Sequence, residues 1–509
     1  MSRSLVFLFM LYGPAALLRA QTPPPTSLPR LTPAMMRFEG AFRLPAEDFG
    51  VSSMNYSEGP LVYHPGRNSI FIVGHNHQQA IAEFAMPALV KSVKLAELNI
   101  AAAPLQNFVT VLDRAPSGNP QELNVIGGLG LIDDQLLVNA YEYYDAGGDN
   151  KHTTLIVRNP NNLANSTVAG FFAFAGGAGH TSGWLSPIPE AWQGLLGGTH
   201  LAGQSSGQPI ISRFSVGPSA FAFNARELTG AGTVATRTLL DFSLEHPLHD
   251  DLENNSRTND LWTHLSRATF GVIVPGTRTY ATFGYSGGHK SGVCYKCTQS
   301  NGYECGGYCA PDAKDYQQSY WFWDVNDLFA VKNGQLAPHA VRPYAYGALT
   351  TPFENAEHQI GGGSFDPSSG RLFFTIQKAD TAQGQYANPP VIVVYRFVID
   401  GSTAVEAEAD ETPHDFELEQ NYPNPFRGNS RGILGKPATM IGFRLSANRH
   451  VRLQVFDVNG REVATLIEGE RAAGKHAVPF TPRDWAGGIY FYRLTAGKFS
   501  QTRKAVLMK

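Results

Sequence analysis

The stretch from Gly361 to Asp400, GGGSFDPSSGRLFFTIQKADTAQGQYANPPVIVVYRFVID, carries the pattern that decides the fold. A first apolar run ends at the segment DPSSG, and a second apolar run follows it. A polar loop then leads to a third apolar run. Asp, Pro, Ser and Gly between two apolar runs indicate a β-hairpin. The stretch therefore predicts three antiparallel strands in one small sheet.

Four earlier stretches repeat this order, and their openings contain Gly59, Gly127, Gly197 and Thr269. The openings lie about 65 to 90 residues apart, a spacing that fits four-stranded blades with inserted loops. We therefore predict an all-β fold: a β-propeller of five blades followed by a C-terminal Ig-like β-sandwich. The number of blades rises to six or seven if weaker strands near 105–113 and 236–243 belong to units of their own. A β-sandwich or an irregular β-solenoid is the alternative for the first domain.

Composition excludes one class of partner. The chain has 509 residues, of which 16% are charged, and it contains 52 Gly and 33 Pro. Few charges and many Gly and Pro favour turns over exposed helices; the best short helix candidate begins at Asn326 and stops at Gly334. With 40 Lys and Arg against 43 Asp and Glu, the formal net charge is −3. No overall positive field is available for a polyphosphate backbone, so nucleic acid is not expected as a partner.

The N-terminal segment predicts export. In residues 1–20 one cation, Arg3, precedes an apolar run and a small residue, which is typical of a secretory signal peptide. The run is shorter than the roughly 20 residues that span a bilayer, and no later stretch is long enough, so no transmembrane span is expected. We expect a Pro-rich leader over residues 21–33, the propeller-like domain over 34–400 and an acidic linker over 401–415.

Residues 416–509 predict a second β-domain. Val451, Leu453 and Val455 alternate with polar residues as in a half-buried strand, and Asn459-Gly460 predicts the turn back into the next strand. A compact sandwich of about seven short strands follows from this pattern.

The order of motifs in this second domain resembles the type IX secretion system C-terminal sorting domain. The motifs are QNYPNPF from Gln420, VFD from Val455, the Asn459-Gly460 turn, and GIY from Gly488 before a Lys-terminated apolar tail. The text RGNSRGILGKPAT departs from the family and lengthens the first loop. The resemblance implies that the type IX secretion machinery is a partner of residues 416–509 and that the chain is secreted or held at the outer-membrane surface. Residues 34–400 resemble uncharacterised exported bacterial proteins, which implies no activity.

The loops after the second strand of each unit are expected to meet on one face of a propeller. Such a mouth offers planar groups for stacking and fixed hydrogen-bonding groups, as an extracellular glycan or protein ligand requires. The ligand-binding residues that we predict are His75, His77, Glu142, Tyr144, Asp145, Tyr285, His289 and Gln377.

The same loops supply candidates for catalysis, namely Glu142, Asp380 and His75. Glu142 with Asp380 or Glu83 would form the carboxylate pair of a glycoside hydrolase. A His and Tyr pair would serve a polysaccharide lyase, which abstracts and returns a proton. His75 and His77 alone do not complete a metal site. Phosphate-loop, dinucleotide and zinc-protease motifs do not occur.

All four cysteines lie in the text CYKCTQSNGYECGGYC, at positions 294, 297, 305 and 309. An exported chain passes an oxidising compartment, so two disulfides are expected, whereas the same spacing in a cytosolic chain would suggest zinc. A bridge between Cys294 and Cys297 would close the shortest ring, so nested or crossed pairings with Cys305 and Cys309 are expected. Reduction of the bridges is expected to loosen this loop without unfolding the domain.

The acidic segment 249–260 contains oxygen ligands for Ca²⁺ but lacks the spacing of a calcium loop, so no cofactor is expected. Two function classes remain. We favour a secreted or cell-surface protein that binds an extracellular glycan or protein without turnover. The alternative is a secreted hydrolase or lyase acting on an extracellular polysaccharide.

Overall fold

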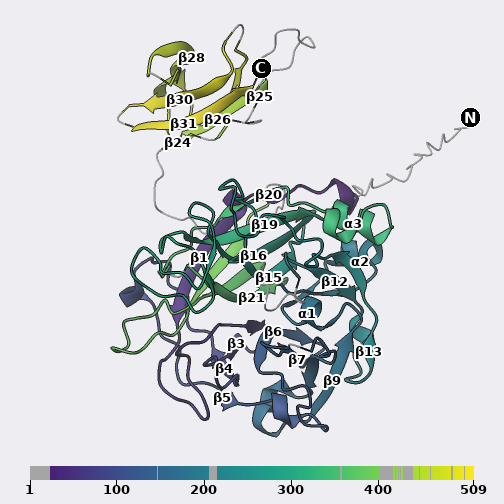
Figure 1. The fold of residues 1–509 in the computed structure, drawn as a ribbon. Coiled ribbons are helices and arrows are strands. Elements are labelled where there is room, and N and C mark those ends of the chain that lie inside the picture. Colours follow the sequence, from purple (N-terminus) through teal and green to yellow (C-terminus); the bar gives the residue numbers. More distant parts are fainter. Residues whose placement is uncertain are drawn as a thin grey trace, which may run out of the picture. The chain divides into compact units, whose positions relative to one another are not determined.

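Antiparallel β-sheets dominate the architecture (Figure 1). The structure is a computed structural model and describes residues 23–508 except 146, 206–214, 356–357, 400–415, 419, 422–423, 425, 428–438, 446, 459, 483–484 and 498. The predicted signal peptide and linker therefore lie outside the described residues. The chain divides into two compact units, Met1–Ser402 and Thr403–Lys509.

The first unit contains five sheets of four or five strands, each built mainly from consecutive segments. The first sheet is β2 (Leu61–His64), β3 (Ser69–Val73), β4 (Ile81–Ala85) and β5 (Gln106–Val109). The second is β6 (Val125–Ile132), β7 (Gln135–Tyr141), β8 (Thr154–Val157) and β9 (Val168–Phe174), with β13 (Thr233–Val234) parallel at its edge. The third is β10 (Leu185–Pro187), β11 (His200–Ala202), β12 (Ala220–Phe223) and β14 (Arg237–Leu240). The fourth is β15 (Arg267–Ile273), β16 (Thr279–Gly287), β19 (Tyr316–Asp324) and β20 (Ala345–Ala348).

The fifth sheet joins both ends of this unit. Its strands are β21 (Ile360–Asp366), β22 (Arg371–Ile376), β23 (Val391–Phe397) and β1 (Met36–Arg43). Residues 360–397 thus form the three expected strands, and the N-terminal strand β1 adds a fourth by pairing antiparallel with β23. Figure 1 shows the purple β1 beside green strands from the other end of the unit.

The first strands of the five sheets contact one another in a cycle. β2 contacts β6, β6 contacts β10, β10 contacts β15, β15 contacts β21, and β21 contacts β2. The weaker strands expected near 105–113 and 236–243 are β5 and β14, and each completes one of these sheets. They do not form units of their own.

Glycines at the repeated openings allow the sheets to approach closely. A Cβ on Gly128 would lie 2.1 Å from the carbonyl oxygen of Gly183, and one on Gly362 would lie 2.5 Å from that of Gly59. Both separations are far below contact distance between non-bonded atoms. Any larger side chain at these two positions would push neighbouring sheets apart.

The apolar core lies between neighbouring sheets. Phe71 and Ile81 of the first sheet pack with Leu136 and Leu155 of the second, while the fifth sheet packs on the first through Phe373 and its neighbours. A cluster rich in tryptophan unites the third, fourth and fifth sheets. The sheets are therefore held side by side through their faces.

Three short α-helices accompany the sheets: α1 (Ala178–Thr181), α2 (Glu190–Leu196) and α3 (Val325–Lys332). The expected helix near Asn326 is confirmed as α3; Asp324 caps it by accepting the backbone N–H of Asn326 at 3.0 Å, and Gly334 with φ +72° follows its end. The described 3-10 helices are η1 (Pro25–Ser27), η2 (Pro33–Met35), η3 (Leu95–Glu97), η4 (Leu112–Arg114), η5 (Pro160–Asn165), η7 (Ala225–Glu227) and η8 (Pro338–Ala340).

The second unit is formed by two sheets that share one core. One sheet contains β24 (Phe416–Leu418), β26 (Thr439–Leu445) and β29 (Gly474–Phe480). The other contains β25 (Phe426–Arg427), β31 (Phe499–Met508), β30 (Gly488–Ala496), β27 (Arg449–Phe456) and β28 (Glu462–Arg471). The expected hairpin is present as β27 and β28, and Val451, Leu453 and Val455 of β27 are buried as their alternation predicts.

The cysteine pairing expected from the sequence is wrong. The structure joins Cys294 to Cys297 and Cys305 to Cys309, the sequential pairing, whereas nested or crossed bridges were expected. The reason is local: the Cα atoms of Cys294 and Cys297 lie 6.0 Å apart and those of Cys305 and Cys309 lie 6.4 Å apart, within the range that a disulfide spans, so the short rings are accessible. The segment also contains a small hairpin of β17 (Cys294–Tyr295) and β18 (Tyr308–Cys309).

Candidate functional site

The first strands of the sheets start at one end of the cycle and finish at the other. The backbone N–H of Gly362, early in β21, donates to Gly59 just before β2, at 3.0 Å. At the far end of the same two strands the N–H of Tyr63 donates to the hydroxyl of Ser364 at 3.0 Å. We call the end where the first strands begin the entry end and the opposite end the turn end. Each second strand runs antiparallel to its first, so the loops after the second strands return to the entry end.

Arg267, the first residue of β15, is the centre of a polar cluster at the entry end. Its Nη2 donates to the hydroxyl of Tyr141 at 2.9 Å, and its Nη1 lies 3.7 Å from a carboxylate oxygen of Glu58. Tyr285 stands opposite Arg267 in the β15–β16 ladder. Burial raises the pKa of Tyr141 to about 12, against the opposing effect of Arg267, so this phenol stays protonated at neutral pH.

A cavity of about 340 Å³ lies beside this cluster and contains two of the predicted residues. Glu142 accepts a hydrogen bond from the side-chain amide of Asn150 at 2.7 Å, and Asp145 accepts the backbone N–H of Gly148 at 2.9 Å. The cavity is also lined by residues of both charges and by aromatic rings, among them Tyr141, Tyr143, Lys151 and His180. It therefore offers donors, acceptors and flat surfaces in one place.

Two aromatic rings in the loop after β7, those of Tyr143 and Tyr144, are exposed to solvent. Tyr143 is 38% exposed and Tyr144 is 59% exposed, and their ring centroids lie 4.8 Å apart in an edge-to-face arrangement. Exposed rings of this kind present the apolar faces on which a sugar ring stacks.

Hydrogen bonds engage ring nitrogens of two of the predicted histidines, His75 and His289. The Nδ1 atom of His75 accepts the backbone N–H of His77 at 3.1 Å, which removes this nitrogen as a metal ligand. Burial and the neighbouring His77 lower the pKa of His75, so its ring is neutral at pH 7. Both ring nitrogens of His289 are engaged, one with Ser286 at 2.7 Å and the other with the carbonyl of Asn259 at 2.9 Å.

The remaining predicted groups are buried. Asp380 is 0% exposed, and its two carboxylate oxygens accept hydrogen bonds from Arg43 at 2.7 and 2.9 Å. Asp380 thereby ties β1 to the loop after β22. Glu83 is likewise 0% exposed and pairs with Arg67 at 3.0 Å. Gln377 donates to the carbonyl of Glu58 at 3.2 Å and lines the small opening beside Arg267.

Three residues of the cluster were missed from the sequence: Arg267, Tyr141 and Glu58. A signal was present, because Glu58 directly precedes the opening at Gly59, and Arg267 lies two residues before Thr269. Residues that lead into a first strand reach the entry end just as the loops after a second strand do. The prediction from the sequence used only the loops after the second strands.

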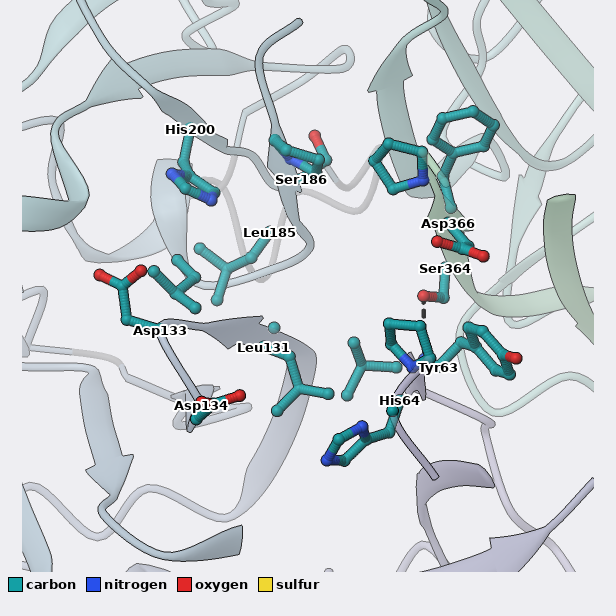
Figure 2. A pocket seen from close by; sticks show the side chains of 18 of the residues that line it. Tyr63, His64, Leu131, Asp133, Asp134, Leu185, Ser186, His200, Ser364 and Asp366 are labelled. Carbon is teal, nitrogen blue, oxygen red and sulfur yellow. Dashed lines mark hydrogen bonds between the residues drawn. The ribbon is translucent and has the colours of Figure 1, made fainter. Parts of the chain in front are cut away.

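A second cavity, of about 440 Å³, opens at the turn end. Figure 2 shows Asp133, Asp134 and Asp366 with His64 and His200 around its centre. No Lys or Arg is among the residues described as lining it. Burial lowers the pKa of His200 to about 4, so this ring adds no positive charge at neutral pH. The lining of the turn-end cavity thus contains carboxylates without Lys or Arg, whereas the entry end combines carboxylates with Arg267 and Lys151.

The comparisons with known proteins add little. No family model and no curated protein matches the sequence. Among solved structures the chain matches PorZ, described as an essential bacterial surface component of the type-IX secretion system of Porphyromonas gingivalis, with a TM-score of 0.30 and 12% identity. The match covers 91% of this chain and 53% of that chain, so the chain spans about half the length of PorZ. A likeness this weak carries no argument about fold or function.

Among the helices of the described residues, none has the length and apolar character needed to cross a bilayer.

Proposed function

We propose that residues 36–397 form a five-bladed β-propeller that binds an extracellular glycan at its entry end. The cyclic contacts between the five first strands support the propeller. So does strand β1, which brings the start of the unit into its last sheet, because pairing across the two ends of the chain closes a ring of blades.

We further infer that the second unit is a type IX sorting domain and that the chain is exported. The motifs in its sequence support this inference, and the contacts of the opening motif give it a physical basis. The backbone N–H of Asn421 donates to the hydroxyl of Tyr492 at 2.7 Å, and the side chain of Asn424 accepts the N–H of Val506 at 2.8 Å. The first motif thus fastens onto the closing strands β30 and β31, so both motifs belong to one folded surface.

The glycan assignment rests chiefly on one observation: Glu142 and Asp145 share a cavity with tyrosine rings beside the Arg267 cluster. Hydroxyl groups of a sugar can donate to the two carboxylates and accept from Lys151. Tyr143 and Tyr144 supply stacking surfaces. The turn-end cavity is a weaker candidate because the ring of its tyrosine, Tyr63, is stacked on Phe373 with centroids 4.6 Å apart.

Binding without turnover is favoured over hydrolysis. A glycoside hydrolase needs two carboxyl groups about 5 to 10 Å apart that both reach the substrate. The two carboxylates considered as partners for Glu142 are Asp380 and Glu83, and both are held in buried ion pairs. Asp145 shares the cavity with Glu142, but both carboxylates are held by hydrogen bonds within this segment, Asp145 by the backbone N–H of Gly148 and Glu142 by the amide of Asn150. We therefore assign both to accepting hydrogen bonds from a ligand.

Retention of the full chain on a panel of immobilised polysaccharides tests this function. We expect at least one polysaccharide to retain the protein, and Tyr143→Ala to weaken the retention roughly tenfold, which corresponds to about 1.4 kcal/mol. Tyr386→Ala is the matched control, because this tyrosine is 80% exposed in another entry-end loop and is not among the residues that line the cavity. It should bind like the unaltered chain.

Other outcomes of the same assay are equally informative. If Asp134→Asn weakens retention and Tyr143→Ala does not, the ligand occupies the turn end and the entry-end site is wrong. If reducing ends are released and Glu142→Gln abolishes the release, the protein is a hydrolase. A chain that no polysaccharide retains contradicts the glycan assignment.

A further inference from the structure

The four cysteines lie on the two arms of one hairpin, in the segment between β16 and β19 of the fourth sheet. Cys294 in β17 stands directly opposite Cys309 in β18. A backbone hydrogen bond of 3.0 Å from Cys305 to the carbonyl of Cys297 joins the arms again further along. The pairing of the arms, and not only the bridges within them, therefore brings cysteines of the two arms together.

The sulfur atoms of the two arms nearly touch. The Sγ atom of Cys309 lies 3.4 Å from that of Cys297 and 4.0 Å from that of Cys294, and these three atoms all lie within 4.8 Å of one another. The fourth sulfur, of Cys305, is bonded to that of Cys309. In a tetrahedral zinc site with Zn–S bonds of about 2.3 Å, neighbouring sulfurs are about 3.8 Å apart. The two inter-arm distances lie on either side of this value.

Two bridges that each stay within one arm do not need such an approach. Each would close its short loop equally well with the arms apart. A single ion bound by both arms, in contrast, requires the four sulfurs to converge. A cation is also close by: the Nζ atom of Lys296 lies 5.3 Å from the ring centroid of Tyr295, on the arm that carries Cys294 and Cys297. Its charge would partly offset the net negative charge of a zinc ion with four thiolates.

We propose that the hairpin of residues 294–309 is a zinc site in the reduced chain, with Cys294, Cys297, Cys305 and Cys309 as its four thiolate ligands. Among the described residues, three of these cysteines, Cys294, Cys297 and Cys309, form the group of His, Cys, Asp or Glu side chains whose ligand atoms come close enough to share an ion. Cys305, next to Cys309 through their bridge, would supply the fourth thiolate. The spacing C-x2-C, then C-x3-C, is close to that of structural zinc sites.

The disulfide and zinc forms interconvert by a balanced reaction. A phosphine reductant and water convert each disulfide into two thiols and a phosphine oxide. Zinc binding to the four thiols then releases four protons, because only thiolates bind the metal. In the other direction, two equivalents of a small-molecule disulfide would oxidise the four thiolates to two disulfides, take up four protons as they are reduced to four thiols, and release the ion. The hairpin would thus be fixed by metal before oxidation and by disulfides after it.

Metal analysis of the full chain tests the proposal. The chain is reduced with a phosphine, incubated with ZnCl₂, passed through a desalting column and analysed by mass spectrometry for zinc. We expect one ion per reduced chain and none on the oxidised chain. Substitution of Co²⁺ should give the visible absorption of a tetrahedral thiolate site, which reports the ligand type independently of stoichiometry.

Two variants separate this site from adventitious binding. Cys297→Ser should lose the ion and the cobalt absorption. His339→Ala is the control, because His339 stacks on His246 with ring centroids 4.1 Å apart, and neighbouring histidines are a source of adventitious zinc binding. The variant should keep both signals. Zinc that is retained by Cys297→Ser, or a reduced and folded chain that takes up none, would overturn the proposal. Circular dichroism of each variant verifies folding.

Discussion

Asp380 shows how an acidic residue in a polar loop can have a structural role. Its sequence context, after a second strand and among Gln and Lys, is the same as that of a ligand-binding loop residue. In the structure its carboxylate is wholly buried against Arg43, 337 positions earlier in the chain. Nothing local in the sequence reports that partner. Glu142 and Tyr285, in contrast, could be assigned to the entry end because the direction of their own strands decides it.

Asp380→Asn should therefore destabilise the first unit strongly. Removing one charge of a buried pair leaves the other uncompensated, at a cost of about 3–5 kcal/mol. Urea unfolding of the full chain measures the change. Glu97→Gln is the control, because Glu97 pairs with Lys94 at 2.9 Å in an exposed position, where solvent screening leaves the pair little effect on stability. Equal costs for the two variants would show that Asp380 is not the tie between β1 and the last sheet.

At the scale of the strands, the positions of glycines in the sequence helped to predict the repeated sheets. The repeated openings at Gly127 and Gly361 were visible as text, and the structure gives their physical reason: the first strands of neighbouring sheets nearly touch there. The completion of the fifth sheet by β1 was not visible. A strand over residues 36–43 has an ordinary apolar pattern, and its partner is set by packing of the whole unit. The cysteine bridges were mispredicted for a related reason, since ring size alone ignores the hairpin that presents the sulfurs.

Gly128→Ala tests this close approach of strands. The new methyl group would lie 2.1 Å from the carbonyl oxygen of Gly183, and overpacking of this kind costs roughly 1–3 kcal/mol. The comparison is Gly194→Ala in α2, where nothing lies within 4 Å of the new Cβ and helix propensity should add up to about 1 kcal/mol of stability. Thermal unfolding should move in opposite directions for the two variants. A neutral Gly128→Ala would mean that the sheets pack less closely than described.

At the scale of the whole molecule, the sequence predicted the all-β class correctly but identified only part of the candidate site. The all-β class and the hairpin of the second unit follow from period-two patterns and turn residues, which are local. The residues of the Arg267 cluster come from the fourth sheet, the second sheet and the segment before the first sheet, so no single stretch contains the site. The propeller, the sorting domain and export remain proposals that rest on the cycle of first strands and on the motifs of residues 416–509.

Hydroxyl-radical footprinting of the full chain, with and without a retained polysaccharide, tests the central claim most directly. This measurement reports the solvent exposure of individual side chains without any substitution. The entry-end account predicts that Tyr143 and Tyr144 lose reactivity when the glycan is bound, while Tyr386 stays unchanged. Protection of Tyr63 and His64 at the turn end, with Tyr143 and Tyr144 as reactive as before, would contradict it.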